Sequence, residues 1–163
     1  MWTIPSSHDI IIYLNHERVA FMEDQLQIAY LAGLFDGEGT ITLLRHNRNE
    51  FKGPVMSMTS TTHNLLVLCQ KSLGGDIQTQ KVCKSHHKPS WSWRVRGNAA
   101  LNAIAKLYPY LQEPEKKRRM QLILSTYKEV TPRNGKYSDE LLLKKKDFEH
   151  EFFHPSNVME LLL

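Results

Sequence analysis

The sequence has few of the features that mark secreted, disulfide-rich or membrane proteins. It contains two cysteines in 163 residues, so reduced thiols are expected rather than a disulfide framework. No apolar run approaches the ~20 residues of a bilayer-spanning helix, so no membrane partner is expected. Residues 1–15 lack the basic segment and cleavage site of a signal peptide, and they are too poor in arginine for a mitochondrial transit peptide. We therefore expect an intracellular protein from an organelle, a bacterium, an archaeon or a phage.

Composition and charge favour one folded domain with a polyanionic partner. Hydrophobic residues make up 41% of the chain, enough for a core and too many for a disordered protein. Lysine and arginine number 21 against 17 acidic residues, which gives a net charge of +4. A basic excess of this size favours nucleic acid only weakly, so the placement of the charges along the chain carries more information than their total.

Hydrophobic periodicity and turn residues predict an α+β domain in which helices alternate with pairs of strands. Asp24 is a suitable N-cap for a first helix that ends at Gly37. Residues 1–22 are expected to form an irregular N-terminal arm with at most one helical turn. Residues 23–163 are expected to form a single domain, with a core of about 24–130 and C-terminal helices within 137–163. The expected strands are 40–48, 54–60, 76–84 and 90–96, and the further helices are 63–73, 97–108, 114–130 and 139–150. Short connections between paired strands favour a four-stranded antiparallel sheet.

The segment 31–39, Leu-Ala-Gly-Leu-Phe-Asp-Gly-Glu-Gly, says most about function. Ala29, Gly33 and Gly37 are four residues apart, so they share one side of the helix and let a second helix approach closely. Asp36 and Glu38 lie at the end of this helix. A close helix pair would bring their carboxylates together, which is costly unless a cation lies between them. Oxygen ligands favour Mg²⁺ or a similar hard ion. The alternative is a buried helix that ends in a glycine-rich turn with solvated acids.

These nine residues resemble the signature of the LAGLIDADG homing endonucleases. Phe35, Gly37 and Glu38 depart from the eponymous letters, and glycine and glutamate are familiar variants at the last two of these places. The predicted order of helices and strands over about residues 24–130 also resembles the αββαββα core of that family. Two further features match it, namely Gly74-Gly75 after the second helix and Tyr-Pro-Tyr-Leu at 108–111 before a basic helix start.

The resemblance implies a metal site and a dimer. In that family the last acidic residue of the motif, here Glu38, binds the catalytic metals, often with help from the preceding carbonyl, here that of Gly37. The implied cofactor is Mg²⁺ or Mn²⁺, with Ca²⁺ binding without supporting cleavage. The chain contains one motif, so the second would come from a second copy in a two-fold homodimer. The implied interface residues are Ala29, Ala32, Gly33, Leu34, Asp36 and Gly37.

The implied activity is hydrolysis of both strands of a long, near-palindromic site in double-stranded DNA, with short 3′ overhangs, as in intron homing. Divalent ions between two Glu38 side chains would polarise the phosphate and lower the pKa of an attacking water. A family lysine at the start of the later helix best matches Lys116, with Lys117 as the alternative, and a cation there would offset charge on the phosphate. An ordinary solvated helix start also remains open for Lys116. Ser60 falls where the family positions water.

The strands after the motif predict a polar face that contacts DNA. In the fourth strand Trp91, Trp93 and Val95 alternate with Ser92, Arg94 and Arg96, so one face is expected to be core and the other polar. Arginine, lysine and glutamine can pair with base edges in the major groove. A solvated sheet face is the alternative interpretation. The candidate DNA-binding residues are Arg45, Arg48, Gln78, Gln80, Lys81, Lys84, Ser92, Arg94 and Arg96.

Two other functions and one other site stay open at this point. An RNA-binding intron maturase and a non-catalytic DNA-binding regulator both occur on this fold, although the acid at Glu38 favours cleavage. Cys83 and His86 have ligand-like spacing for zinc, but the spacing to other ligands fits no common zinc finger. Cys69 falls in a predicted core helix, so it is expected to be an ordinary buried thiol.

Overall fold

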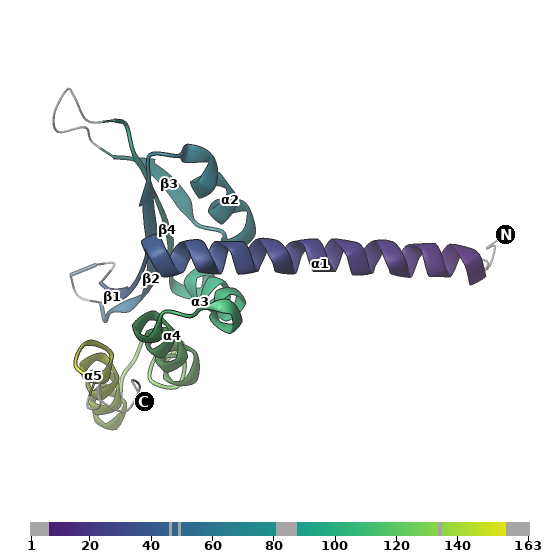
Figure 1. Ribbon diagram of the computed structural model, residues 1–163. Coiled ribbons are helices and arrows are strands. Elements are labelled where there is room, and N and C mark those ends of the chain that lie inside the picture. The colour runs from purple at the N-terminus through teal and green to yellow at the C-terminus, as the bar shows by residue number, and fades with distance from the viewer. Residues whose placement is uncertain (1–6, 46, 49, 81–87, 134, 156–163) are drawn as a thin grey trace.

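The computed structural model describes residues 7–45, 47–48, 50–80, 88–133 and 135–155, with the backbone alone for residues 7–21. Helices α1, α2 and α3 lie on one side of a four-stranded sheet, and α4 and α5 lie beyond its β1 edge (Figure 1). The elements are α1 (Ser7–Glu38), β1 (Gly39–Leu44), β2 (Gly53–Ser60), α2 (His63–Leu73), β3 (Asp76–Thr79), β4 (Trp91–Arg96), α3 (Gly97–Leu107), a 3₁₀ turn η1 (Tyr108–Tyr110), α4 (Pro114–Thr126) and α5 (Asp139–Phe153). The predicted αββαββα order with added C-terminal helices is confirmed.

Helix α1 is longer than the sequence prediction. It begins at Ser7 and runs for 32 residues, so the expectation of an irregular segment up to residue 22 is wrong from Ser7 onward. Asp24 lies inside the helix and is not its N-cap. Between Pro5 and Gly33 the sequence contains neither proline nor glycine, the two residues that most disfavour helix, so nothing local interrupts it. The division into an arm at 1–22 and a domain at 23–163 stays a prediction.

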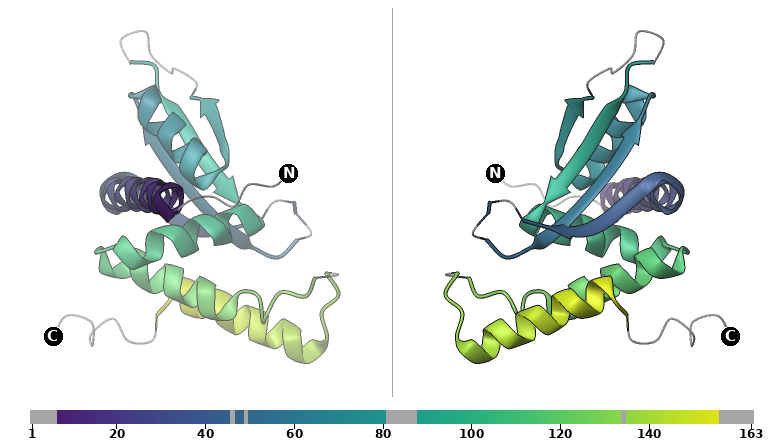
Figure 2. Two further views of the ribbon diagram at one scale, coloured as in Figure 1. Left: turned by 90° about the vertical axis from the view of Figure 1, so that its right-hand side faces the viewer. Right: turned by 90° about the vertical axis from the view of Figure 1, so that its left-hand side faces the viewer.

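The sheet has a buried face and an open face. Its strand order is β1-β2-β4-β3, and all neighbours are antiparallel. Ile41 pairs with Met56, and Met56 pairs with Val95, and all three side chains are buried under the helices. Residues that alternate with these point to the opposite side, which no helix of the described chain covers in Figures 1 and 2. One buried and one open face are usual for an antiparallel sheet.

A pair of glycines ends α2 and fixes it on the sheet. The predicted helix 63–73 is confirmed, and Gly74 and Gly75 follow it with φ of 77° and 89°. A side chain is strained at such φ values. A Cβ on Gly75 would also lie 2.5 Å from the carbonyl oxygen of Arg94, so the turn approaches β4 too closely for any other residue. Trp93 Nε1 donates a hydrogen bond to the carbonyl of Gly74 at 2.7 Å, which ties the turn to β4.

Strands β1 and β3 are shorter than predicted. Strand β1 ends at Leu44 rather than at residue 48, which leaves Arg45 and Arg48 in the connection to β2. Strand β3 ends at Thr79, although the backbone N–H of Gln80 still donates to the carbonyl of Ser90 at 2.8 Å. The predicted continuation of this strand to residue 84 lies outside the described residues.

The C-terminal helices are held to the sheet by arginines of α4. Arg118 Nη2 donates to the carbonyl oxygen of Phe152 at 3.0 Å, at the end of α5, and Arg119 Nη1 donates to that of Ile41 at 3.3 Å, in β1. Both guanidinium groups also bind Glu115, and the hydrogen bond from Arg118 is the main reason that the pKa of Glu115 is lowered. Helix α4 therefore lies between β1 and α5.

Cys69 is a buried thiol in α2, as predicted. Burial raises its pKa to about 11, so it is neutral and unreactive at neutral pH. Cys83 and His86 lie outside the described residues. Within the described ranges no helix combines the length and the apolar character needed to cross a membrane.

Candidate functional site

Glu38 is the last residue of α1 and is exposed. The chain passes from the helix directly into β1 at Gly39. The ring of Phe35 lies where a Cβ of Gly39 would be, so only glycine fits at this junction. The Glu38 carboxylate makes no hydrogen bond or ion pair with any residue that the structure describes. Its oxygens are therefore available to a ligand from outside the chain.

The end of β2 brings Ser60 to the same place. Glu38, Ser60 and Thr61 line one open cavity of about 380 Å³ at the end of α1. Ser60 Oγ accepts a hydrogen bond from the backbone N–H of Thr62 at 3.0 Å, in the turn that leads into α2. This contact fixes the hydroxyl oxygen and leaves its hydrogen free to donate. The structure thus places two of the three predicted catalytic side chains together.

Lys116, the third predicted catalytic residue, binds the C-terminal end of α1. Its Nζ donates to the carbonyl oxygens of Phe35 at 3.0 Å and of Asp36 at 2.5 Å. A cation is favourable there because the last carbonyls of a helix lack partners and carry the negative end of the helix dipole. Within the described residues the ammonium of Lys117 makes no such contact. The ammonium of Lys116 is therefore bound to α1 and not simply solvated, and its catalytic role stays a prediction.

Asp36 fastens the start of α4 to the end of α1. Its Oδ2 accepts from the backbone N–H of Gln112 at 2.8 Å and its Oδ1 from that of Glu113 at 3.2 Å. Glu113 in turn is the N-cap of α4 and accepts from the N–H groups of Glu115 and Lys116, at 3.2 and 2.6 Å. The sequence analysis overlooked Glu113. The signal was Pro114, since proline favours the first helical position and makes the residue before it the N-cap.

The open face of the sheet begins beside Glu38 and is mostly polar. By register, β1 contributes Thr40, Thr42 and Leu44, β2 contributes Val55, Ser57 and Thr59, β4 contributes Ser92, Arg94 and Arg96, and β3 contributes Asp76 and Gln78. Of the predicted DNA-binding residues, Gln78, Ser92, Arg94 and Arg96 lie on this face, and Ser92 is buried among its neighbours. Gln80, Arg45 and Arg48 are exposed in the connections, and Lys81 and Lys84 lie outside the described residues. Thr40 and Thr42 were not among the predicted DNA-binding residues, although their alternation with Ile41 and Leu43 in the predicted strand places them on this face.

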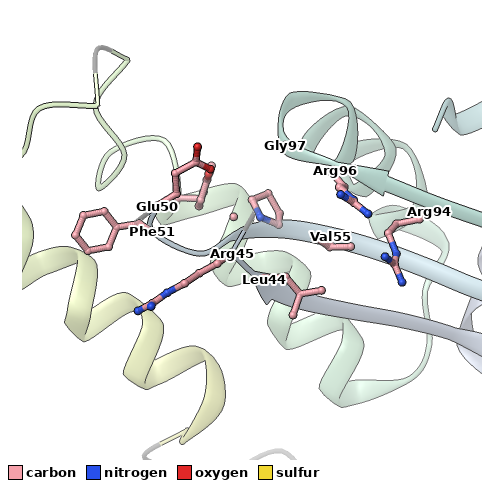
Figure 3. A pocket seen from close by; sticks show the side chains of 11 residues that line it. Leu44, Arg45, Glu50, Phe51, Val55, Arg94, Arg96 and Gly97 are labelled. Carbon is pink, nitrogen blue, oxygen red and sulfur yellow. The ribbon is translucent and has the colours of Figure 1, made fainter. Parts of the chain in front are cut away.

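The open face contains a hollow of about 420 Å³ at the end of β4. Figure 3 shows the guanidinium groups of Arg94 and Arg96 beside Val55, with Leu44 on the next strand. Arg45 points away from these two arginines in the same view. The hollow therefore combines two arginine side chains with an apolar floor.

Four of the six predicted dimer-interface residues, Ala29, Gly33, Leu34 and Gly37, are exposed or partly exposed on α1. Gly33 and Gly37 are exposed, and a Cβ on either would meet no atom within 4 Å. Ala29 and Leu34 are partly exposed. Ala32 is fully buried against the chain's own core, so its assignment to an interface is wrong. Asp36 is half-buried, and its carboxylate is already bound to the start of α4.

One chain alone does not offer a complete metal site within the residues described. Those residues contain no group of three or more histidine, cysteine or acidic side chains that could hold an ion together. The donors near the end of α1 are the open carboxylate of Glu38 and backbone carbonyls. They are hard oxygen donors of the kind that Mg²⁺ prefers.

Solved structures with this arrangement of elements are homing endonucleases. The homing endonuclease I-CvuI, in complex with its target, has a TM-score of 0.64 and 23% sequence identity over 81% of this chain and 83% of that one. The archaeal intron-encoded homing endonuclease I-Vdi141I, in complex with DNA, has a TM-score of 0.55 and 20% identity over 82% and 86%. The LAGLIDADG homing endonuclease I-GzeII, in complex with its DNA target, has a TM-score of 0.57 and 15% identity over 75% of this chain and 43% of that one. This chain has the LAGLIDADG homing endonuclease fold.

The LAGLIDADG resemblance of the motif therefore agrees with the fold, which the matches cover over 75–82% of the chain. No family model and no curated protein matches the sequence. In this fold the motif helix is α1, and the residue at the position of the motif acid, Glu38, lies where the helix meets the sheet.

Proposed function

We propose that this chain is a metal-dependent, sequence-specific DNA endonuclease that acts as a homodimer. The observation that carries the proposal is the Glu38 carboxylate, which is open and unpaired among the described residues, at the helix end that also holds the Lys116 ammonium. A polar, open sheet face leads away from that point. The similar structures of I-CvuI and I-Vdi141I contain DNA.

The sheet is the surface proposed to contact DNA. Strand β2 has eight residues, which span about 26 Å, and a twisted sheet of that length fits within one turn of the major groove. An arginine such as Arg94 can donate two hydrogen bonds to a guanine, and the exposed Leu44 can contact a thymine methyl group. Such contacts select sequence, whereas the basic residues of the connections contact phosphates and add affinity that falls with salt.

The glycines of α1 support a second copy as the source of the other half of the site. Gly33 lies inside a helix, where glycine costs about 0.5–1 kcal/mol relative to alanine. Nothing in the described chain requires it, because a Cβ there would meet open space. A close approach by another α1 does require it. Two-fold pairing along Gly33 and Gly37 brings the two Glu38 residues together and implies a near-palindromic target.

In that dimer the metal would be held by the Glu38 carboxylate and the Gly37 carbonyl of each copy, together with DNA phosphate oxygens. A bound Mg²⁺ or Mn²⁺ stabilises negative charge on the phosphate and makes water a better nucleophile at neutral pH. Ser60 can donate a hydrogen bond to a water in the cavity that it shares with Glu38. Lys116 adds a fixed positive charge, and its two carbonyl contacts prevent it from moving into solvent.

The test is cleavage of a library of partly randomised, near-palindromic duplexes in Mg²⁺ or EDTA. Wild type should cut both strands in Mg²⁺ alone, and mapping of the cut ends should give short 3′ overhangs. Glu38→Gln should bind the selected duplex and fail to cut it, whereas the exposed Glu129→Gln control should cut normally. Binding of DNA without cutting by all three proteins would instead support a regulator, and preferential binding of RNA would support a maturase.

A further inference from the structure

The outward side of α1 carries three large exposed apolar side chains. Met22, Leu26 and Tyr30 are 60%, 69% and 53% exposed, and they follow one another at four-residue steps. Residues at this spacing lie on one side of a helix. The side that packs on the sheet carries Ile28 and Phe35, which are 5% and 1% exposed. Helix α1 is therefore apolar on two opposite sides, and this chain covers only one of them within the described residues.

The exposed stripe spans the point at which α1 leaves the body of the protein, since residues 22–26 are exposed and Ile28 is buried. A helix of 32 residues is about 48 Å long. Figures 1 and 2 show that α1 meets the sheet at its C-terminal end, runs steeply away from it past α2 and α3, and projects beyond them toward its N-terminus. In water an isolated helix of this kind is marginal, since most helical stability comes from packing of an apolar side. A projecting helix with exposed methionine, leucine and tyrosine therefore suits a partner surface.

The sequence of α1 has the repeat expected of a two-stranded coiled coil. Ile12, Val19, Leu26 and Gly33 are spaced by seven residues, and Met22 and Ala29 fall three residues after Val19 and Leu26. These are a and d positions of one heptad register. Ile12 and Val19 are β-branched residues at a, which favours two parallel strands, whereas Asn15 and Asp36 fall at the other two d positions.

Charges in the sequence fit the same register. Arg18 falls at a g position and Glu23 at an e position five residues later. In a parallel pair the g position of one helix lies near the e position of the other. Arg18 of one copy would therefore lie near the oppositely charged Glu23 of the other copy.

We propose that α1 pairs in parallel with α1 of a second copy as a coiled coil. This coiled coil continues the close helix contact proposed at Gly33 and Gly37, here called the glycine seam, in the direction away from the DNA. The proposal rests on the homodimer proposed above, because bringing both Glu38 residues to one end requires parallel helices. A second copy is the occupant that the surface fits, since the stripe from Met22 to Leu26 and Tyr30 is continuous with Gly33 and Gly37, and a two-fold axis places each stripe against itself. In this pair the two helix axes would be farther apart at Met22 and Leu26, which have large side chains. They would be closer together at Gly33 and Gly37, near Glu38.

Disulfide trapping in the full chain tests this pairing. In a Cys83→Ser background, Leu26→Cys places thiols at the seam, and Asp24→Cys places them on the opposite side of the same helix, where Asp24 is also exposed. On mild oxidation, Leu26→Cys should form a covalent dimer at least ten times faster than Asp24→Cys. Sedimentation supplies the second measurement, in which Leu26→Lys should weaken the dimer at least tenfold and Asp24→Lys should not.

The outcomes separate this proposal from the proposed function. A wild-type dimer that shows equal trapping at both positions and no effect of Leu26→Lys overturns the coiled coil and leaves the dimeric endonuclease intact. Selective trapping in a protein that never cuts DNA keeps the coiled coil and rejects the endonuclease. A wild-type protein that is monomeric with and without target DNA overturns both.

Discussion

At the C-terminal end of α1, the Asp36 carboxylate and the Lys116 ammonium bind different backbone groups. The Asp36 carboxylate faces the start of α4 and binds the N–H groups of Gln112 and Glu113. The Lys116 ammonium comes back from α4 and binds the carbonyls of Phe35 and Asp36. These contacts run in both directions between the same two elements. They hold a cation at a fixed place at the end of the helix that ends in Glu38, and Asp36 acts as a positioning residue for that cation.

Replacement of Lys116 should affect cleavage much more than DNA binding. Lys116→Met removes a positive charge from the helix end where the phosphate is proposed to react, so we expect about a 100-fold lower single-turnover cleavage rate and an almost unchanged Kd for the target duplex. Lys117→Met is the matched control, since it removes the same charge one residue away. Equal losses in the two variants would show that general basic charge matters, and not the place of Lys116.

Among the helices, α5 contains an unusual buried lysine. Lys145 is fully buried, its Nζ donates to Thr131 Oγ1 at 3.0 Å, and the ammonium lies 4.3 Å from the centre of the Tyr127 ring. Burial lowers the pKa of Lys145 to about 8, and the nearby Glu149 opposes this shift in part. Glu149 is itself only loosely paired, 3.7 Å from Lys52. The stability that α5 contributes is therefore expected to depend on pH.

The unfolding free energy should rise with pH because of Lys145. Between about pH 8 and 10.5 the unfolded chain keeps the proton that the folded chain has lost, so raising the pH favours the folded state, while below pH 8 the burial penalty is fully present. Relative to Lys145→Met, wild type should gain about 3 kcal/mol at most across this window. Burial raises the pKa of Tyr127 and Tyr137, and both tyrosines are common to the two proteins. Urea unfolding at several pH values measures the difference, and parallel curves would contradict it.

Elements with local start and stop signals could be predicted from the sequence, and those without them could not. Helix α2 matches its prediction at both ends because Thr62 precedes it and Gly74-Gly75 follows. The start of α1 was missed because the apolar residues of this helix fall on two sides, one buried and one exposed, so they do not show a single apolar stripe. Strand β1 was predicted too long, since the sequence does not show where its pairing with β2 stops.

The candidate site followed the same pattern. Glu38 and Ser60 were predicted from the resemblance at the ends of their elements, and the fold brings them to one cavity. The contacts of Asp36 with Gln112 and Glu113 depend on how α4 packs against α1. These residues are far apart in the sequence, so no local pattern reveals the contacts. Ala32 was misassigned because small residues occur on both sides of α1 and only packing shows which side is buried.

At the scale of the whole molecule, three parts of α1 differ in their surroundings. The N-terminal half of α1 projects from the body, the residues from Ile28 to Phe35 pack on it, and the last residue, Glu38, lies where the open sheet face begins (Figure 1). In the proposed dimer the coiled coil, the glycine seam and the two carboxylates follow one another along the two-fold axis. The two sheets then extend to either side along the DNA.

The central claim is that each reaction uses Glu38 from both copies. The measurement that tests it most directly is double-strand cleavage by purified mixed dimers of one wild-type and one Glu38→Gln subunit, isolated with two different affinity tags. We expect at least a tenfold loss of cleavage rate relative to the wild-type dimer on both strands, because neither scissile phosphate keeps a complete set of carboxylates. A mixed dimer that retains half of the wild-type rate, or cuts one strand at full rate, would contradict a shared site.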